Sequence, residues 1–302
     1  MSIATERIGR ESPGSELSAA QPQHGSPAPL PVTVIERRHG WHFLDLGELW
    51  RYRELLFFLT WRDVMVRYKQ TVLGAAWAIL QPLATMLVFS LFFRKAAAST
   101  TSSVPYSLFV LAGLVPWMFF SNAIAQAGQS VVGSQNLVTK VYFPRLMIPM
   151  GSVAAGLVDF AIASAMLLIM MVYYGLGWSW SILVAPWIVL GLVVAALGVG
   201  VLLSALTVAY RDFRHVVPFM VQFWMFATPC IYLQQEGAVG PRAQLLLPLN
   251  PAYGLISNFR AAVLGEPFDL YSLAVSAAVS LAILLIGCLY FRRVENRFAD
   301  II

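Results

Sequence analysis

Six apolar segments, each long enough to cross a lipid bilayer, constrain this chain more than any other feature of its sequence. A hydrocarbon core about 30 Å thick needs roughly 20 apolar residues in one helix, because lipid offers no partner to an open backbone N–H or C=O. Hydrophobic residues make up 59% of the chain and charged residues 12%, which excludes a water-soluble fold. We therefore predict an all-α integral membrane protein with six transmembrane helices, at 72–93, 104–128, 147–174, 182–209, 216–232 and 271–291.

Lysine and arginine in the flanks of these segments predict the orientation, because positively charged loops stay on the cytoplasmic side. With an inner N-terminus, sixteen of the twenty Lys and Arg residues fall in inner segments. The outer segments then hold only Arg94, Lys95, Arg242 and Arg260. Both termini are therefore predicted to be cytoplasmic. The net charge of +5 then reflects topology, and no nucleic acid is expected as a partner.

The N-terminal residues 1–31 differ in composition from the rest of the chain. They are rich in Pro, Ser, Gln and Gly, and such a segment is too polar to bury a core. We predict a disordered cytoplasmic tail there, and a single transmembrane domain over 32–302.

An amphipathic stretch precedes the first apolar segment, at residues 48–63. Trp50 and Trp61 lie near its ends, as is typical of a bilayer interface. One apolar face at helical spacing consists of Leu49, Tyr52, Leu56 and Leu59. The pattern predicts an N-terminal interfacial helix lying on the membrane. The alternative is an ordinary amphipathic helix of a soluble region.

The outer stretch between the last two segments, 233–270, contains an apolar piece, AYGLISNFRAAVL at 252–264, that is too short to cross the membrane. Pieces of about 10–14 apolar residues are typically re-entrant or interfacial, so we predict a re-entrant segment that closes the outer mouth. Arg260 is the charge within this piece. It either faces a water-filled exit, where it meets an anionic group, or its side chain simply reaches the interface.

Chemically active side chains are almost absent from the six segments. Asp159 is the one ionisable residue in them, and it is either a relay or gate residue or a carboxylate bonded by neighbouring Ser or Thr. The four His and two Cys lack metal-ligand spacing, so no metal is expected. No G-x-x-x-x-G-K-[ST] loop occurs, since GSQNLVTK at 133–140 lacks the second Gly. We predict no cofactor in this chain, and any ATP hydrolysis must come from a separate chain.

Four strings carry a family resemblance. They are WRDVMVRYKQTVLGAAWAILQPL at 61–83, LVTKVYFPRLMIPM at 137–150, YRDFRHVVPFMVQFWMFATPCIY at 210–232 and LNPAYGLISNFRAAVLG at 249–265. Together they closely resemble the membrane subunits of ABC exporters for O-antigen, capsular polysaccharide and teichoic acid. The resemblance runs from residue 32 to the C-terminus and leaves only the Pro-rich tail outside the family pattern.

The resemblance implies a multi-pass permease subunit of the cytoplasmic (inner) membrane, part of an ATP-driven exporter of lipid-linked polysaccharide. Two copies of the chain form a channel, and two copies of a nucleotide-binding subunit bind ATP and Mg²⁺. The chain itself is then not an enzyme. The alternatives are a membrane-embedded glycosyl- or acyl-transferase acting on a lipid-linked sugar, and a channel or ion-driven carrier. The first lacks catalytic His, acidic pairs and metal clusters, and the second lacks charged residues in the spans.

Aromatic side chains at helical spacing are the candidates for the lining of a glycan path, because the apolar faces of sugars stack on aromatic rings. Arg260 joins them as the charged member of the set. The alternative for each ring is a lipid-facing aromatic belt or plain helix packing. The candidates are Phe89, Phe92 and Phe93 in the first segment, Tyr106, Phe109, Trp117 and Phe120 in the second, and Phe219, Phe223 and Phe226 in the fifth.

The cytoplasmic segment between the second and third spans, 135–145, is the candidate contact with the ATPase. We predict a short helical stretch with two aromatic side chains exposed to a partner groove, and then Pro144, which ends the helix. The resemblance agrees, because a coupling helix lies at this position in the exporter family. The alternative is a charged loop that only fixes topology. The candidate residues are Lys140, Tyr142, Phe143, Pro144 and Arg145.

Overall fold

Helices make up all the regular structure in the described part of the chain. The computed structural model describes residues 46–69, 74, 76–97, 104–177, 179–228, 230 and 246–295. The α-helices are α1 (Leu46–Arg51), α2 (Arg53–Lys69), α3 (Ala76–Ala97), α4 (Tyr106–Gly133), α5 (Gln135–Lys140), α6 (Met147–Tyr173), α7 (Ala185–Ala209), α8 (Phe213–Phe226), α10 (Tyr253–Leu264) and α11 (Leu270–Glu295). Short 3₁₀ helices are η1 (Trp180–Val184) and η2 (Leu247–Leu249). The predicted all-α class is confirmed, and the tail 1–31 lies outside the described residues.

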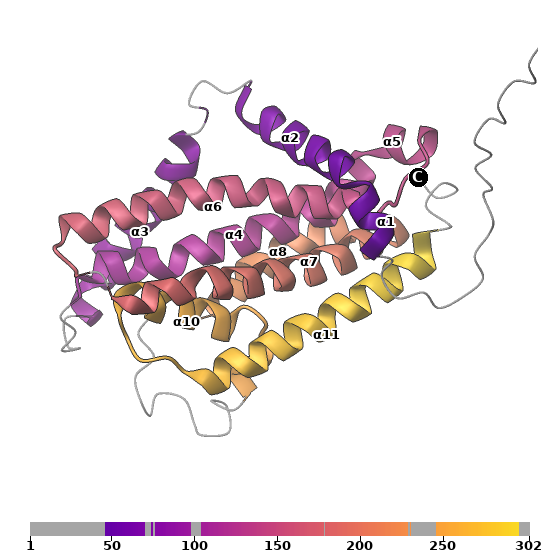
Figure 1. Ribbon diagram of the computed structural model, residues 1–302. Coiled ribbons are helices and arrows are strands. Elements are labelled where there is room, and N and C mark those ends of the chain that lie inside the picture. The colour runs from indigo at the N-terminus through magenta and orange to yellow at the C-terminus, as the bar shows by residue number, and fades with distance from the viewer. Residues whose placement is uncertain are drawn as a thin grey trace, which may run out of the picture. The chain divides into compact units, whose positions relative to one another are not determined.

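Four helices are long and apolar enough to cross a membrane: α4, α6, η1 with α7, and α11. They match four of the six predicted segments within a few residues. The longest single helix, α4, has 28 residues and is therefore about 42 Å long, so it extends past a hydrocarbon core of about 30 Å. In Figure 1 these four run side by side, with α1 and α5 at one end and α10 toward the other.

The first and fifth predicted segments are represented by shorter apolar helices. The described apolar part of α3 is Ala76–Phe92, and residues 70–73 and 75, where the prediction begins, lie outside the described residues. The fifth segment was predicted over 216–232, but α8 ends at Phe226 after 14 residues, a length of about 21 Å. Residues 229 and 231–232 lie outside the described part.

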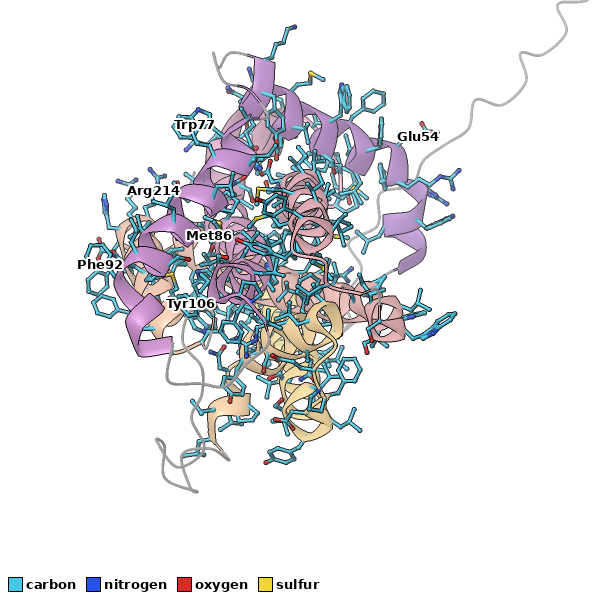
Figure 2. The ribbon with its side chains drawn as sticks, turned by 90° about the vertical axis from the view of Figure 1, so that its left-hand side faces the viewer. Glu54, Trp77, Met86, Phe92, Tyr106 and Arg214 are labelled. Atoms are coloured by element: carbon cyan, nitrogen blue, oxygen red, sulfur yellow. The ribbon has the colours of Figure 1, made fainter. Side chains whose placement is uncertain are left out.

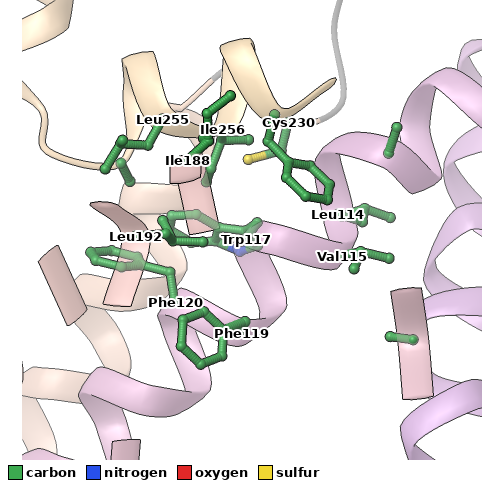
Figure 3. Close-up of a cluster of buried hydrophobic side chains, with 14 of the residues drawn as sticks. Leu114, Val115, Trp117, Phe119, Phe120, Ile188, Leu192, Cys230, Leu255 and Ile256 are labelled. Atoms are coloured by element: carbon green, nitrogen blue, oxygen red, sulfur yellow. The ribbon is translucent and has the colours of Figure 1, made fainter. Parts of the chain in front are cut away.

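Helix α4 is the centre of the bundle and contacts α3, α6, α7, α8 and α10. Its rings Trp117 and Phe120 pack with Ile188 and Leu192 of α7 and Leu255 of α10 (Figure 3). Because other helices surround α4, apolar residues on all its faces are buried.

Small residues bring α7 and α11 into close contact. A Cβ atom on Gly198 would lie 2.7 Å from the backbone N of Leu284, and one on Gly287 would lie 2.8 Å from the carbonyl O of Gly198. In lipid, helices associate by such close packing rather than by the hydrophobic effect. The α7–α11 contact is therefore specified by its glycines.

The predicted interfacial helix at 48–63 forms as two helices, α1 and α2, which meet at Tyr52, and the second continues to Lys69. Leu59 and Val64 are buried, and α2 packs against α6. A Cβ on Gly151 of α6 would approach the Cβ of Leu59 to 3.1 Å, so the two helices lie close together. Large rings of α1 and α2 are exposed: Trp50, Phe57, Phe58 and Trp61.

Candidate functional site

A polar cluster joins the end of α2 to α4 and α6. The Arg67 guanidinium forms an ion pair with Asp159 of α6 and donates to the side-chain carbonyl of Gln126 on α4. The Tyr68 hydroxyl donates to the second oxygen of Asp159. Burial raises the pKa of Tyr68 and lowers that of Arg67. Of the two alternatives for Asp159, the one with neighbouring Ser or Thr as partners is thus wrong, because an arginine and a tyrosine of α2 bind it instead.

A second polar contact fastens the middle of α2. The Ser152 hydroxyl of α6 donates to Asp63 at 3.0 Å, and Arg62 pairs with the same carboxylate at 2.8 Å. Beside these groups lies an open pocket of about 410 Å³. It is lined by Arg62, Asp63, Val66, Arg67, Gln126, Gly133 and Ser134. The last two residues directly precede α5, so the pocket lies between α2 and the predicted coupling segment.

The predicted coupling segment begins with α5, which ends at Lys140, four residues before Pro144. Pro144 therefore lies in the turn before α6 and does not end the helix. Tyr142 is 78% exposed, whereas Phe143 is 5% exposed and packs in a cluster with Leu59 and Phe291. The prediction that both rings are exposed is correct for Tyr142 and wrong for Phe143.

The two basic residues of this segment differ in their surroundings. Lys140 is exposed at the end of α5. Arg145 contacts the end of α11, since its backbone N–H donates to the Glu295 carboxylate at 3.3 Å and its guanidinium donates to the Glu295 carbonyl. The linker between α5 and α6 is thereby connected to α11.

The aromatic candidates of the second predicted span lie inside the helix bundle. Three of them are at most 4% exposed: Phe109, Trp117 and Phe120. The Phe120 ring meets the Trp224 ring of α8 edge-on, with 5.3 Å between the ring centres. The Tyr106 ring stacks on the Phe109 ring, with 6.3 Å between the ring centres, and packs against the same core. Within a single copy of the chain, other helices therefore cover the faces of these rings.

The exposed aromatic candidates lie on α3 and α8. On α8, Phe219, Phe223 and Phe226 are 59–63% exposed and share one face. On α3, Phe92 is 77% exposed and points away from the bundle, as Figure 2 shows. Phe89 is partly buried against the core, and the Phe93 side chain lies outside the described part.

Arg260 does not face an exit in this structure. It is 7% exposed, and its guanidinium carbon lies 4.1 Å from the centre of the Phe109 ring. Such a cation–π contact is favourable where water is excluded. The predicted water-facing position of Arg260 is thus wrong, because α10 packs against α4 and turns this side chain inward.

A polar network at the outer segment was missed by the sequence prediction. Asn250 binds the end of α8, and Asn258 of α10 donates to the carbonyl of Asp269 at 3.1 Å and to that of Gly254 at 2.8 Å. The signal was available, since two amides lie within the LNPAYGLISNF string of the family resemblance.

Comparison with known proteins gives consistent relationships over most of the chain. The sequence profile of ABC-2 type transporters matches residues 54–264. The O-antigen export system permease protein RfbA of Myxococcus xanthus is 31% identical, over 84% of this chain and 97% of that protein. RfbA of Klebsiella pneumoniae is 24% identical over 85% and 97%, and the polysialic acid transport protein KpsM of Escherichia coli is 25% identical over 78% and 91%. The chain therefore belongs to the ABC-2 type transporter family: it is a multi-pass permease subunit of the inner membrane rather than an enzyme, and a separate subunit binds ATP.

Proposed function

We propose that this chain forms the transmembrane path of an ATP-driven exporter that moves a lipid-linked polysaccharide out across the cytoplasmic membrane. The observation that carries the proposal is the match to an O-antigen export permease along 84% of the chain. The further relatives are named for O-antigen export and polysialic acid transport, so their cargoes share glycan chemistry. A transferase acting on a lipid-linked sugar has no comparable support.

The path lies between two copies of the chain. The centre of one copy is filled by side chains of α4, with Trp117 and Phe120 at most 3% exposed, so it offers a glycan no passage. Helices α3 and α8, by contrast, present large apolar side chains outward, among them Leu91, Phe92 and Phe223. Two copies that face each other across these helices enclose a wider path than one bundle. This supports a homodimer served by two ATP-binding subunits.

In this proposal α3 and α8 supply the remaining two of six crossings, and both termini are cytoplasmic. The contact of Arg145 with Glu295 brings the α5–α6 linker to the end of α11, where Arg292 and Arg293 lie. Basic residues thus collect at one end of the bundle, as cytoplasmic flanks do. Helix α10, with 12 residues, is about 18 Å long and is buried against α4, α7 and α11, which supports a re-entrant outer segment.

The function is tested by reconstitution of the chain with its ATP-binding partner in proteoliposomes. A lipid-linked O-antigen-type glycan on the cytoplasmic-equivalent side is expected to become accessible to a glycosidase on the other side only when ATP is hydrolysed. A control complex with a hydrolysis-deficient ATPase gives no transfer. Covalent change of the glycan by the chain alone, or ATP hydrolysis without transfer, contradicts the proposal.

The exposed α8 stripe is the candidate contact with the moving glycan. Phe223→Ala is expected to lower the rate of export about threefold to tenfold, because one aromatic stacking surface is worth roughly 1 kcal/mol. Assembly of the complex should be unchanged, since the ring is 59% exposed. Trp187→Ala on α7, exposed to 74%, is the matched control and should export normally. Equal export by both variants removes the stripe from the path.

The coupling segment makes a separate prediction, because its two rings have different roles. Tyr142→Ala should leave the chain folded but weaken binding of the ATPase, since this ring is 78% exposed beside Lys140. Phe143→Ala should instead lower the free energy of unfolding by about 3 kcal/mol, because it empties a buried site. Co-purification and thermal melting of the two variants separate the effects. Full ATPase retention and normal export by Tyr142→Ala contradict the coupling role.

A further inference from the structure

One amide side chain, that of Asn250, fastens the outer end of α8. The indole N–H of Trp224, in the last turn of α8, donates to Asn250 Oδ1 at 2.8 Å. The Asn250 amide nitrogen donates to Thr228 Oγ1 at 2.9 Å and, at a longer 3.4 Å, to the carbonyl of Ala227. This single side chain thus satisfies three polar groups where α8 ends.

Asn250 is held in turn by α10 and α11. Its Oδ1 also accepts from the backbone N–H of Ala252, directly before α10, at 3.0 Å. Its backbone carbonyl accepts from the Ser276 hydroxyl of α11 at 3.0 Å, and that hydroxyl accepts from the N–H of Gly254 at 3.0 Å. Asn250 therefore connects three helices, and two of them fix its position.

Apart from the edge-on contact between the Trp224 and Phe120 rings, helix α8 has few other contacts that determine its rotation. Val217 is the one buried residue among its 14, while Val221, Trp224 and Met225 are partly buried against the core. The opposite face is exposed. Because apolar side chains are as well solvated by lipid as by protein, that pattern alone does not select one rotation.

The hydrogen bond to the indole does select one. Successive residues of an α-helix point about 100° apart. Turning α8 by one residue replaces Trp224 at Asn250 by Phe223 or Met225, and neither side chain has an N–H donor. The partly buried amide oxygen and the indole N–H would then each lose a partner, which costs free energy. One rotation of α8 is therefore favoured over its neighbours.

We propose that Asn250 is a positioning residue that sets the rotation of α8 and so presents the Phe219, Phe223 and Phe226 face to the transport path. The last clause rests on the proposed function, since that face is the glycan contact suggested above. The rotation itself does not depend on the cargo.

The test measures the two faces of α8 directly in the full-length chain, assembled with its ATP-binding partner in membranes. Spin labels are attached through Phe223→Cys on the exposed face or Val221→Cys on the packed face, after the buried Cys230 and Cys288 have been changed to Ala. Accessibility to oxygen and to a water-soluble nickel chelate reports whether each label is free or packed. In the parent, the label at position 223 is expected to be the more accessible.

Trp224→Phe removes the N–H donor and keeps a ring beside Phe120. It is expected to reduce the accessibility ratio between positions 223 and 221 by about threefold or more, as loss of one interhelical hydrogen bond implies. Asn250→Leu, the second variant, should act in the same direction. Trp187→Phe makes the same substitution on an exposed part of α7 and should leave the ratio unchanged.

Unchanged ratios in both Trp224→Phe and Asn250→Leu overturn the positioning role. Failure of both variants to assemble also overturns it, because the pair would then be required for folding and not for rotation. Glycan export measured on the same variants separates the two proposals. A changed ratio with normal export leaves the role of Asn250 standing and removes the α8 face from the path.

Discussion

Gly254→Ala is expected to lower the free energy of unfolding by about 3 kcal/mol or more, the upper end for overpacking, even though alanine favours a helix by about 1 kcal/mol. A Cβ atom at this position of α10 would lie 2.0 Å from the carbonyl oxygen of Ser272 and 2.4 Å from its carbon. Both are backbone atoms of α11, so no side-chain rotation relieves the clash. Helix α10 must move away from α11, and the hydrogen bond from the Gly254 N–H to Ser276 is lost with it.

Two other glycines provide graded controls for this prediction. A Cβ on Gly191 would lie 2.8 Å from Cδ2 of Leu255, the far end of a flexible side chain, and one on Gly177 would have no atom within 4 Å. The expected order of damage is therefore Gly254, then Gly191, then Gly177. Thermal melting of the detergent-solubilised complex measures it. If the Gly254→Ala and Gly177→Ala proteins have the same melting temperature, the close approach of α10 and α11 is not present in solution.

Asp159→Ala is expected to cost about 4 kcal/mol, within the range for removing one partner of a buried ion pair. The carboxylate binds Arg67 and Tyr68, and the two charged side chains are about three-quarters buried, at 25% and 24% exposure. Without the carboxylate, the Arg67 guanidinium stays beside apolar helices with Gln126 as its remaining bonded side chain among the contacts described above. The cost comes from a charge that has lost its ion pair and keeps only the longer-range attraction of Asp63.

The double variant Arg67→Leu with Asp159→Leu should recover most of this loss, because an apolar pair of similar volume is often as stable as a buried ion pair. Arg62→Ala is the matched control. Its pair with Asp63 is more exposed, at 45% for the arginine, so the change should cost less than about 1 kcal/mol. Equal melting of Asp159→Ala and Arg62→Ala argues against a buried pair. If the double variant recovers no stability, the hydrogen-bonding groups of the pair, and not their charge, stabilise the fold.

Local composition was enough to predict the class and most of the elements. The apolar segments around Trp117, Asp159 and Gly198 form the long helices α4, α6 and α7 with ends near those predicted. Length and hydropathy decide whether a segment can leave water, and both are properties of the segment alone. In the fifth segment the described helix ends at Phe226, although the apolar run continues past it.

Hydrogen-bond partners that are distant in the sequence could not be predicted from local composition. Asp159 and Tyr68 are 91 residues apart, and nothing in the pattern around Asp159 indicates that α2 lies against it. Asn250 and Trp224 are separated by 26 residues, and their bond depends on how α10 and α11 place the amide.

The sequence by itself determined that this chain is helical and membrane-embedded. Only the tertiary structure decided which side chains face inward: Phe143 and Arg260 are buried, while Tyr142 and Phe223 are exposed. The physical reason is the solvent. In water, apolar periodicity marks the face of a helix that is buried, but lipid tails are as apolar as a protein core. The sequence pattern of an aromatic stripe is therefore the same whether the stripe faces lipid, a transport path or a neighbouring helix. Only the packing in the tertiary structure distinguishes these three cases.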